Sequence, residues 1–146
     1  MDNVDMELLK MLVRNARISL RELGLRVGLS TSGVRRRIKQ MEKAGVIKGY
    51  AAVVDPKKSG KKITAFLRVK VNSHDIRKVG RSLARYAEVC EVHRITGDHS
   101  LIAKVRTQDL DSLNKFIEDK LNSHDGVVSV STAVAMETFR ENGLGF

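Results

Sequence analysis

The order of hydrophobic periods after residue 62 constrains the fold more than any other feature of the chain. Four segments have the alternating apolar pattern of half-buried strands, namely residues 63–72, 88–96, 100–107 and 127–138. Two segments between them repeat their apolar positions every three or four residues, as amphipathic helices do, namely residues 75–87 and 108–123. The predicted order is therefore βαββαβ, which is that of a ferredoxin-like sandwich.

This order predicts an α+β domain with one uncovered face. The right-handed crossover rule places both helices on the same side of a four-stranded antiparallel sheet. The remaining face needs a cover, and we expect a second copy of the chain to supply it in a homodimer. Small residues along the last strand would permit a close approach there: Ser129, Ser131, Ala133 and Ala135.

The chain before this domain contains a helix with clear start, spacing and stop signals. Ser30 can accept hydrogen bonds from the first free backbone N–H groups. Val34, Ile38 and Met41 recur at i, i+4 and i+7, so that one narrow stripe faces a core. Gly45 can adopt the left-handed conformation that ends a helix. We therefore predict a helix that begins after Ser30 and ends before Gly45.

Two further helices are predicted before this one. The first covers residues 4–15, and the second begins at a capping box formed by Ser19 and Glu22. Gly28 then breaks the chain. Two short helices joined by a tight glycine turn, with a preceding helix to complete the core, predict a winged-helix-like helix-turn-helix domain. A plain three-helix bundle with no role on DNA is the alternative.

The distribution of charge favours a nucleic-acid partner for the first part of the chain. The net charge is +10, and residues 1–62 carry 15 Lys and Arg against 6 Asp and Glu. Residues 63–146 carry 12 against 11 and are therefore nearly neutral. Such asymmetry indicates a nucleic-acid-binding module joined to a module with another task. A basic surface that is merely solvated is the alternative.

The polar face of the predicted third helix supplies the candidate contacts to double-stranded DNA. They are Ser30, Thr31, Ser32, Arg35, Arg36, Arg37 and Lys39. Because the first residues of a recognition helix reach base edges, we expect Ser32, Arg35 and Arg36 near bases and Lys39 on phosphate. As an alternative, Arg36 or Arg37 pairs within the domain.

The connection between the two parts is basic. Residues 46–55 are rich in β-prone side chains and predict a short strand that leaves the first domain. Residues 56–62 contain the only proline and four lysines, and we interpret them as a solvated linker. The predicted domains are residues 1–53 and 63–146, with a basic linker at 54–62.

Several other functions are excluded or disfavoured. A single cysteine, Cys90, allows neither an internal disulfide nor a multi-cysteine zinc site. The histidines show no metal spacing, and no apolar run is long enough to span a membrane. Asp98, His99 and Ser100 are adjacent, so they cannot form the line of nucleophile, base and orienting group of a hydrolase. We expect a cytoplasmic protein that is not an enzyme and has no cofactor or metal.

An ordered set of motifs extends over essentially the whole chain. It comprises Asp5-x-x-Leu8-Leu9-x-x-Leu12, Arg17-Ile18-Ser19-x-x-Glu22-Leu23, Val27-Gly28-Leu29-Ser30, Val34-x-x-Arg37-Ile38, Glu42-x-x-Gly45-Val46-Ile47-x-Gly49-Tyr50, Thr96-Gly97-Asp98 and Gly126-Val127. In this order the motifs resemble the prokaryotic Lrp/AsnC, or feast/famine, transcriptional regulators. The second domain then corresponds to the ligand-binding module of that family, the RAM domain.

The resemblance implies a regulator that binds DNA as a dimer, often assembles into octamers, and binds an amino-acid effector between protomers. The candidate effector-binding residues that it implies are Thr96, Gly97, Asp98, His99, Ser100, Asn114, Thr132, Ala133 and Val134. Many relatives have an aromatic residue and an acid where this chain has His99 and Ser100. The identity of the effector therefore stays open.

Two other functions remain as alternatives. A branch with the same layout resembles the sirohaem decarboxylases, although such enzymes would not need so cationic a helix. The other alternative is an architectural DNA-binding protein without an effector. Sequence-specific, effector-modulated regulation of transcription is the function that the sequence favours.

Overall fold

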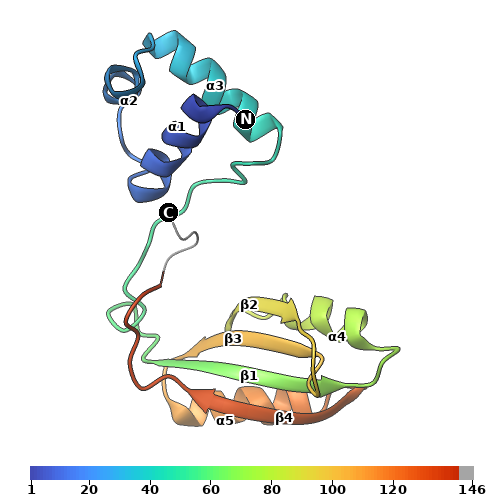
Figure 1. Cartoon of the computed structure of the whole chain (residues 1–146). Helices are drawn as coiled ribbons and strands as arrows, with labels where there is room; N and C mark the ends of the chain where they lie inside the picture. The colour runs from blue at the N-terminus through green and yellow to red at the C-terminus, as the bar shows by residue number, and fades with distance from the viewer. Residues whose placement is uncertain (142–146) are drawn as a thin grey trace. The chain divides into compact units, whose positions relative to one another are not determined.

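The computed structural model describes residues 1–141. They form two compact units, one of Met1–Val53 together with residues 140–141 and one of Val54–Phe139 (Figure 1). The predicted linker therefore falls within the second unit.

The first unit is built from the three predicted helices, α1 (Asn3–Arg14), α2 (Leu20–Val27) and α3 (Thr31–Lys43). Each helix turns an apolar side towards a shared core, to which Leu8, Leu23 and Val34 contribute fully buried side chains. The stripe predicted for α3 is buried as expected. This confirms the helix-turn-helix arrangement, because α2 and α3 are joined by three residues and share one core.

A glycine permits the tight turn between α2 and α3. The backbone N–H of Leu29 donates to the Gly24 carbonyl at 2.9 Å, so the turn folds back onto α2. A Cβ on Gly24 would lie only 2.4 Å from the Leu29 oxygen. Gly28 ends α2 in the left-handed region at φ 69°. The lack of a side chain at Gly24 therefore allows the Leu29 backbone to lie close to α2, although glycine weakens the helix that contains it.

Two local predictions in the first unit are wrong. Ser19 accepts a hydrogen bond from the Glu22 N–H at 3.1 Å, but the Glu22 carboxylate pairs with Arg26 instead of returning to Ser19. The box is thus half formed. Residues 46–55 do not form a strand, because among the described residues no other strand pairs with them. A β-prone segment needs a partner to satisfy its backbone groups.

The second unit has the predicted βαββαβ order and confirms the ferredoxin-like fold. Its elements are β1 (Ile63–Val71), α4 (Ile76–Leu83), β2 (Val89–Arg94), β3 (Leu101–Thr107), α5 (Leu110–Phe116), the π-helical turn η1 (Ile117–Asn122) and β4 (Val127–Val134). The four strands form one antiparallel sheet in the order β2-β3-β1-β4. The central strands β1 and β3 are therefore each flanked on both sides.

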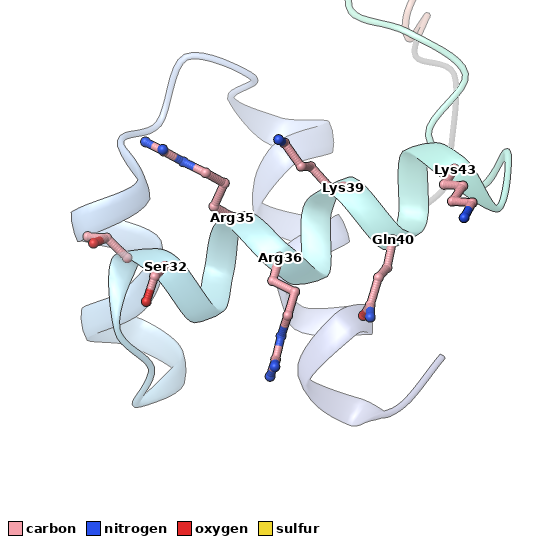
Figure 2. Close-up of a pocket in the computed structure, with 7 residues that line it drawn as sticks. Ser32, Arg35, Arg36, Lys39, Gln40 and Lys43 are labelled. Carbon is pink, nitrogen blue, oxygen red and sulfur yellow. The ribbon is translucent and has the colours of Figure 1, made fainter.

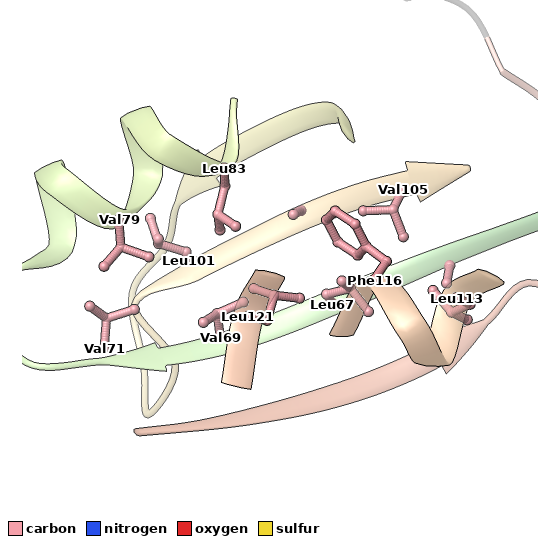
Figure 3. Packing of buried hydrophobic residues seen from close by; sticks show 12 residues of the cluster. Leu67, Val69, Val71, Val79, Leu83, Leu101, Val105, Leu113, Phe116 and Leu121 are labelled. Atoms are coloured by element: carbon pink, nitrogen blue, oxygen red, sulfur yellow. The ribbon is translucent and has the colours of Figure 1, made fainter. Parts of the chain in front are cut away.

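Both helices cover the same face of this sheet, as predicted (Figure 3). The alternate residues Leu67 and Val69 of β1 are fully buried under Leu83 of α4 and Phe116 of α5. The intervening side chains point to the opposite face, where Phe66 is 38% exposed. The open face agrees with the uncovered face predicted from the sequence, and the exposed Phe66 on it was not predicted.

The open face of the sheet is mixed in character. Phe66 lies opposite Lys104 on one side and Ala133 on the other. The Lys104 ammonium is 3.4 Å from the Glu91 carboxylate, and its side chain is only 12% exposed. This surface thus combines apolar groups with charges that neighbouring strands partly satisfy.

Candidate functional site

The exposed face of α3 is fixed by the way the helix begins and ends. Ser30 caps its start, because its Oγ accepts from the Gly33 N–H at 3.2 Å. At the other end Gly45, at φ 71°, and Val46 donate their N–H groups to carbonyls of the last helical turn. With the Val34 side buried, the opposite side of α3 must face outward.

A hollow of about 480 Å³ runs along this outward face (Figure 2). Its lining residues are Thr31, Ser32, Arg35, Arg36, Lys39, Gln40 and Lys43. The structure therefore brings together five of the seven candidates from the sequence and adds Gln40 and Lys43. Both additions could have been found from helical spacing, since each lies four residues after a predicted contact.

The outward side chains form two rows along α3. Figure 2 shows Arg35 and Lys39 pointing to one side of the helix, and Arg36 and Gln40 pointing to the other. Each pair is spaced at i and i+4, which places its members above one another on one face. Ser32 begins the second row, four residues before Arg36. The face thus has a row that contains Arg35 and Lys39, followed by Glu42 in a neighbouring hollow, and a row that contains polar and charged residues.

The positive charge of this face is not neutralised by ion pairs, although Glu42, whose carboxylate accepts from the Tyr50 hydroxyl, shares a neighbouring hollow with Arg35 and Lys39. The charged residues that line the hollow along this face are all cations, namely Arg35, Arg36, Lys39 and Lys43. Within residues 1–141 none of these four makes an ion pair. A concentrated positive potential on an exposed helix attracts a polyanion such as the phosphate backbone of DNA.

Arg37 is placed differently from its neighbours. Its guanidinium lies 2.6 Å from an Asp2 oxygen and 2.8 Å from an Asp5 oxygen, and thus joins α3 to the start of α1. This is the pairing within the domain that the sequence left open for one arginine. Ser30 is also outside the hollow, and its Oγ is engaged at the helix start.

The two carboxylates that hold Arg37 also cap α1. The Asp5 N–H donates to Asp2 and the Asp2 N–H donates to Asp5, which completes a reciprocal capping box. These backbone hydrogen bonds, and then those from Arg37, hold the pKa of both carboxyls below their ordinary value. The hydrogen bonds that Arg37 donates to Asp5 and Asp2 raise the pKa of Arg37. The cluster therefore stays ionised at neutral pH.

A second hollow, of about 640 Å³, lies beside the turn between β2 and β3. Its lining residues are Ile76, Arg94, Ile95, Thr96, Gly97 and Ser100. Three of these were candidates for effector binding, and Arg94 is the charged residue among them. Arg94 was not predicted from the sequence, because a single arginine does not belong to any repeating pattern. Gly97 adopts φ 101°, which bends the chain at this turn.

The other effector candidates lie elsewhere in the chain. The turn adjoins the end of β1, where the Ser100 N–H donates to the Val69 carbonyl at 3.1 Å. Thr132 and Val134 of β4 instead pair with Leu67 and Ala65, in the first half of β1. Asp98, His99 and Asn114 do not line the hollow, and Asn114 is exposed on α5. One chain therefore does not bring the candidates into a single site.

Metal sites and membrane spans were sought over the described part of the chain. No cluster of three or more His, Cys, Asp or Glu able to hold a metal ion occurs in residues 1–141. Over the same residues, every helix is too short or too polar to cross a bilayer.

Two family models match the chain along its length. The model described as winged helix-turn-helix DNA-binding matches residues 1–48. The model described as the Lrp/AsnC ligand binding domain matches residues 64–144. The matches thus correspond to the unit with the cationic helix and the unit with the βαββαβ sandwich.

Named relatives and solved structures agree with these matches. The HTH-type transcriptional regulator FL11 of Pyrococcus horikoshii is 34% identical over 97% of this chain and 93% of its own length. The transcriptional regulator NMB0573 of Neisseria meningitidis, solved as a complex with L-Met, has a TM-score of 0.90 and 30% identity, with 97% of this chain and 94% of that chain covered. AsnC of E. coli has a TM-score of 0.90 and 28% identity, with 99% and 97% covered.

The fold and the cationic helix define a DNA-binding transcriptional regulator. The relatives are named as regulators, and the chain is accordingly a regulator rather than an enzyme. More particularly, the chain belongs to the Lrp/AsnC family.

Proposed function

We propose that the protein is a sequence-specific regulator whose DNA affinity or assembly responds to an amino-acid effector bound between protomers. The observation that carries the DNA-binding part is the outward face of α3, the second helix of the helix-turn-helix, where four cations line one hollow and none makes an ion pair within residues 1–141. A helix in this position enters the major groove in other helix-turn-helix proteins. Because a prokaryotic chromosome lies in the cytoplasm, we expect the protein to act there.

The proposed contacts to DNA come from the hollow on α3. Its lining residues reach the duplex: Thr31, Ser32, Arg35, Arg36, Lys39, Gln40 and Lys43. Ser30 and Arg37 hold the helix in place instead, because both are engaged in hydrogen bonds within the domain. This division gives five of the seven sequence candidates a contact role and two a positioning role.

The proposed effector site combines residues of two chains. One protomer supplies the turn, with Arg94 available for a ligand carboxylate and Thr96 for a hydrogen bond. Asp98 and His99 lie within the turn, between Gly97 and Ser100. A neighbouring protomer supplies the remaining candidates: Asn114, Thr132, Ala133 and Val134. The L-Met complex of the regulator from Neisseria meningitidis supports an amino acid as the ligand class.

The proposed assembly is a homodimer that associates further into octamers. The open face of the sheet, with Phe66 exposed, supports a dimer formed through that face. Two recognition helices in such a dimer would enter successive major grooves if they lie about 34–36 Å apart. An operator with two half-sites one helical turn apart would then fit the protein.

Titration of the full chain with operator-length DNA tests this function. Binding-site selection should return a consensus, and binding to it should weaken as salt rises, because phosphate contacts release counterions. A panel of the twenty amino acids should contain at least one that changes the affinity or the assembled mass. An architectural protein would show the salt dependence alone, with neither a consensus nor a ligand effect.

A further inference from the structure

We propose that Gln40 is a specificity-determining residue that reads an adenine, next to a guanine read by Arg36. The inference rests on the proposed function and goes beyond it, because it assigns base identities to a row of side chains. Gln40 was not among the candidates from the sequence.

The first support is the freedom of the Gln40 side chain. Gln40 is exposed and lines the hollow on α3, and over residues 1–141 its side-chain amide makes no hydrogen bond. Several exposed polar side chains of the same unit are engaged locally, such as Glu22 with Arg26 and Tyr50 with Glu42. The Gln40 amide is thus available with both its donor and its acceptor.

The second support is the direction in which the side chain points. Figure 2 shows Gln40 on the same side of α3 as Arg36, opposite to Arg35 and Lys39. Arg35 and Lys39 also line a separate hollow with Leu20, at the start of α2. Because the first helix of a helix-turn-helix crosses the DNA backbone, the row next to α2 lies on the phosphate side. The row of Arg36 and Gln40 is left for the bases.

This division changes one expectation from the sequence. Arg35 was expected near bases because it lies early in the helix. Its shared row with Lys39 now places it on the phosphate side. A residue's position along a helix does not determine the side of the helix on which it lies. That side decides whether its side chain reaches bases or phosphates.

The third support is the match between helix rise and base spacing. Arg36 and Gln40 are four residues apart, which corresponds to a rise of about 6 Å along α3. Successive base pairs are about 3.4 Å apart, so the two side chains address positions roughly two steps apart. Arginine binds O6 and N7 of guanine with two hydrogen bonds, and glutamine binds N6 and N7 of adenine in the same way. Each half-site should thus contain a guanine and an adenine at that separation.

Binding-site selection with the full-length protein and three variants tests the assignment. Gln40→Ala should remove the preference for adenine at one position of each half-site, a loss of roughly 5- to 150-fold in discrimination. Gln40→Arg should replace that adenine with guanine and leave the other positions unchanged. Lys39→Ala is the matched control, and it should weaken binding evenly across sequences without altering the consensus. Circular dichroism should show the same helix content for all the proteins.

The outcomes separate this inference from the function on which it rests. If the wild-type protein returns a consensus that both Gln40 variants leave unchanged, the assignment of Gln40 is overturned and the regulator function stands. If the wild-type protein returns no consensus, the proposed function fails and the assignment fails with it. The assignment is supported if Gln40→Ala loses the preference for adenine at one position only and Gln40→Arg prefers guanine at that position.

Discussion

Three consecutive arginines on α3 have three different surroundings. Arg35 lies in the row of Lys39, Arg36 in the row of Gln40, and Arg37 bridges Asp2 and Asp5 at the start of α1. Successive residues of an α-helix are rotated by about 100°, so three neighbours in sequence point in three different directions. The sequence was sufficient to predict the helix and its polar side. The partners of Arg37 are more than thirty positions away, and only the packing of α1 against α3 identifies them.

The ion-pair cluster at Arg37 should make the stability of the first unit depend on pH in the acid range. The pKa of Asp2 and of Asp5 lies below the ordinary value of 3.8 in the folded protein, because backbone N–H groups and Arg37 donate to their charged forms. Their contribution is thus complete above pH 3.8 and disappears as the pH falls through the lowered values. Denaturant unfolding followed by circular dichroism between pH 2 and 6 should show this loss.

Variants of the neighbouring arginines provide the control for this prediction. Arg37→Ala should reduce the acid dependence without removing it, since the two carboxyls lose one donor to their charged forms and keep the backbone hydrogen bonds of the capping box. Arg36→Ala should leave the dependence as it is in the wild-type protein, because Arg36 faces outward. An acid dependence that is equal in wild type and Arg37→Ala would contradict the role of the cluster.

At the scale of elements, local signals were sufficient to place the helices, but they predicted neither the π-helical segment Ile117–Asn122 nor the absence of one expected strand. Ser30 and Gly45 mark the start and end of α3 in the sequence, and the structure confirms both. The alternating pattern over β1 and β3 also predicted these strands correctly, because one side of each strand is buried under the helices and the other side lies on the open face. Residues 46–55 had the composition of a strand and do not form one. Composition predicts that a segment fits a sheet, whereas pairing depends on a partner that the composition does not specify.

The turn between α2 and α3 should reverse the usual effect of replacing glycine in a helix. An alanine within a helix is normally about 1 kcal/mol more favourable than glycine. At Gly24, however, the added Cβ would meet the Leu29 carbonyl at 2.4 Å. Gly24→Ala should therefore destabilise the first unit by about 1–3 kcal/mol, as overpacking does. Thermal or denaturant unfolding measures the change.

The same substitution on α4 is a matched control. A Cβ on Gly80 would contact only the end of the Leu101 side chain, at 3.6 Å, which is an ordinary contact. Gly80→Ala should leave the second unit unchanged or stabilise it by about 0.5–1 kcal/mol. Equal effects of the two substitutions would show that backbone approach does not explain Gly24.

At the scale of the whole molecule, the charge difference between the two parts was visible in the sequence and corresponds to two separate tasks. The first unit carries the proposed DNA contacts, and the nearly neutral residues 63–146 carry the proposed effector and assembly surfaces, while the four lysines of the linker fall within the second unit. The order of strands followed from their period and handedness rules. The effector candidates could not be placed from the sequence, because the register of β4 on β1 determines which of them lie near the turn.

A charge on the open face of the sheet should prevent the proposed dimer. Phe66→Asp would place a carboxylate at a position that is 38% exposed and lies between two neighbouring strands. Because a two-fold interface contains each substitution twice, association should be strongly weakened. Sedimentation velocity should show the mass of a monomer, and DNA with two half-sites should be bound more weakly. Arg77→Glu on the exposed side of α4 should keep the wild-type mass, and an assembled Phe66→Asp protein would exclude this face.

The register of β4 on β1 has a further consequence under the proposed arrangement. Since one chain holds the β2–β3 turn and residues 132–134 at different halves of β1, a complete ligand site exists only when two chains meet. Binding of the effector then depends on how many chains have associated. The apparent dissociation constant for the effector therefore falls as the concentration of the chain rises. A cell that contains few copies would be insensitive to the effector even when the effector is abundant. The regulator would thus measure its own abundance together with that of its ligand.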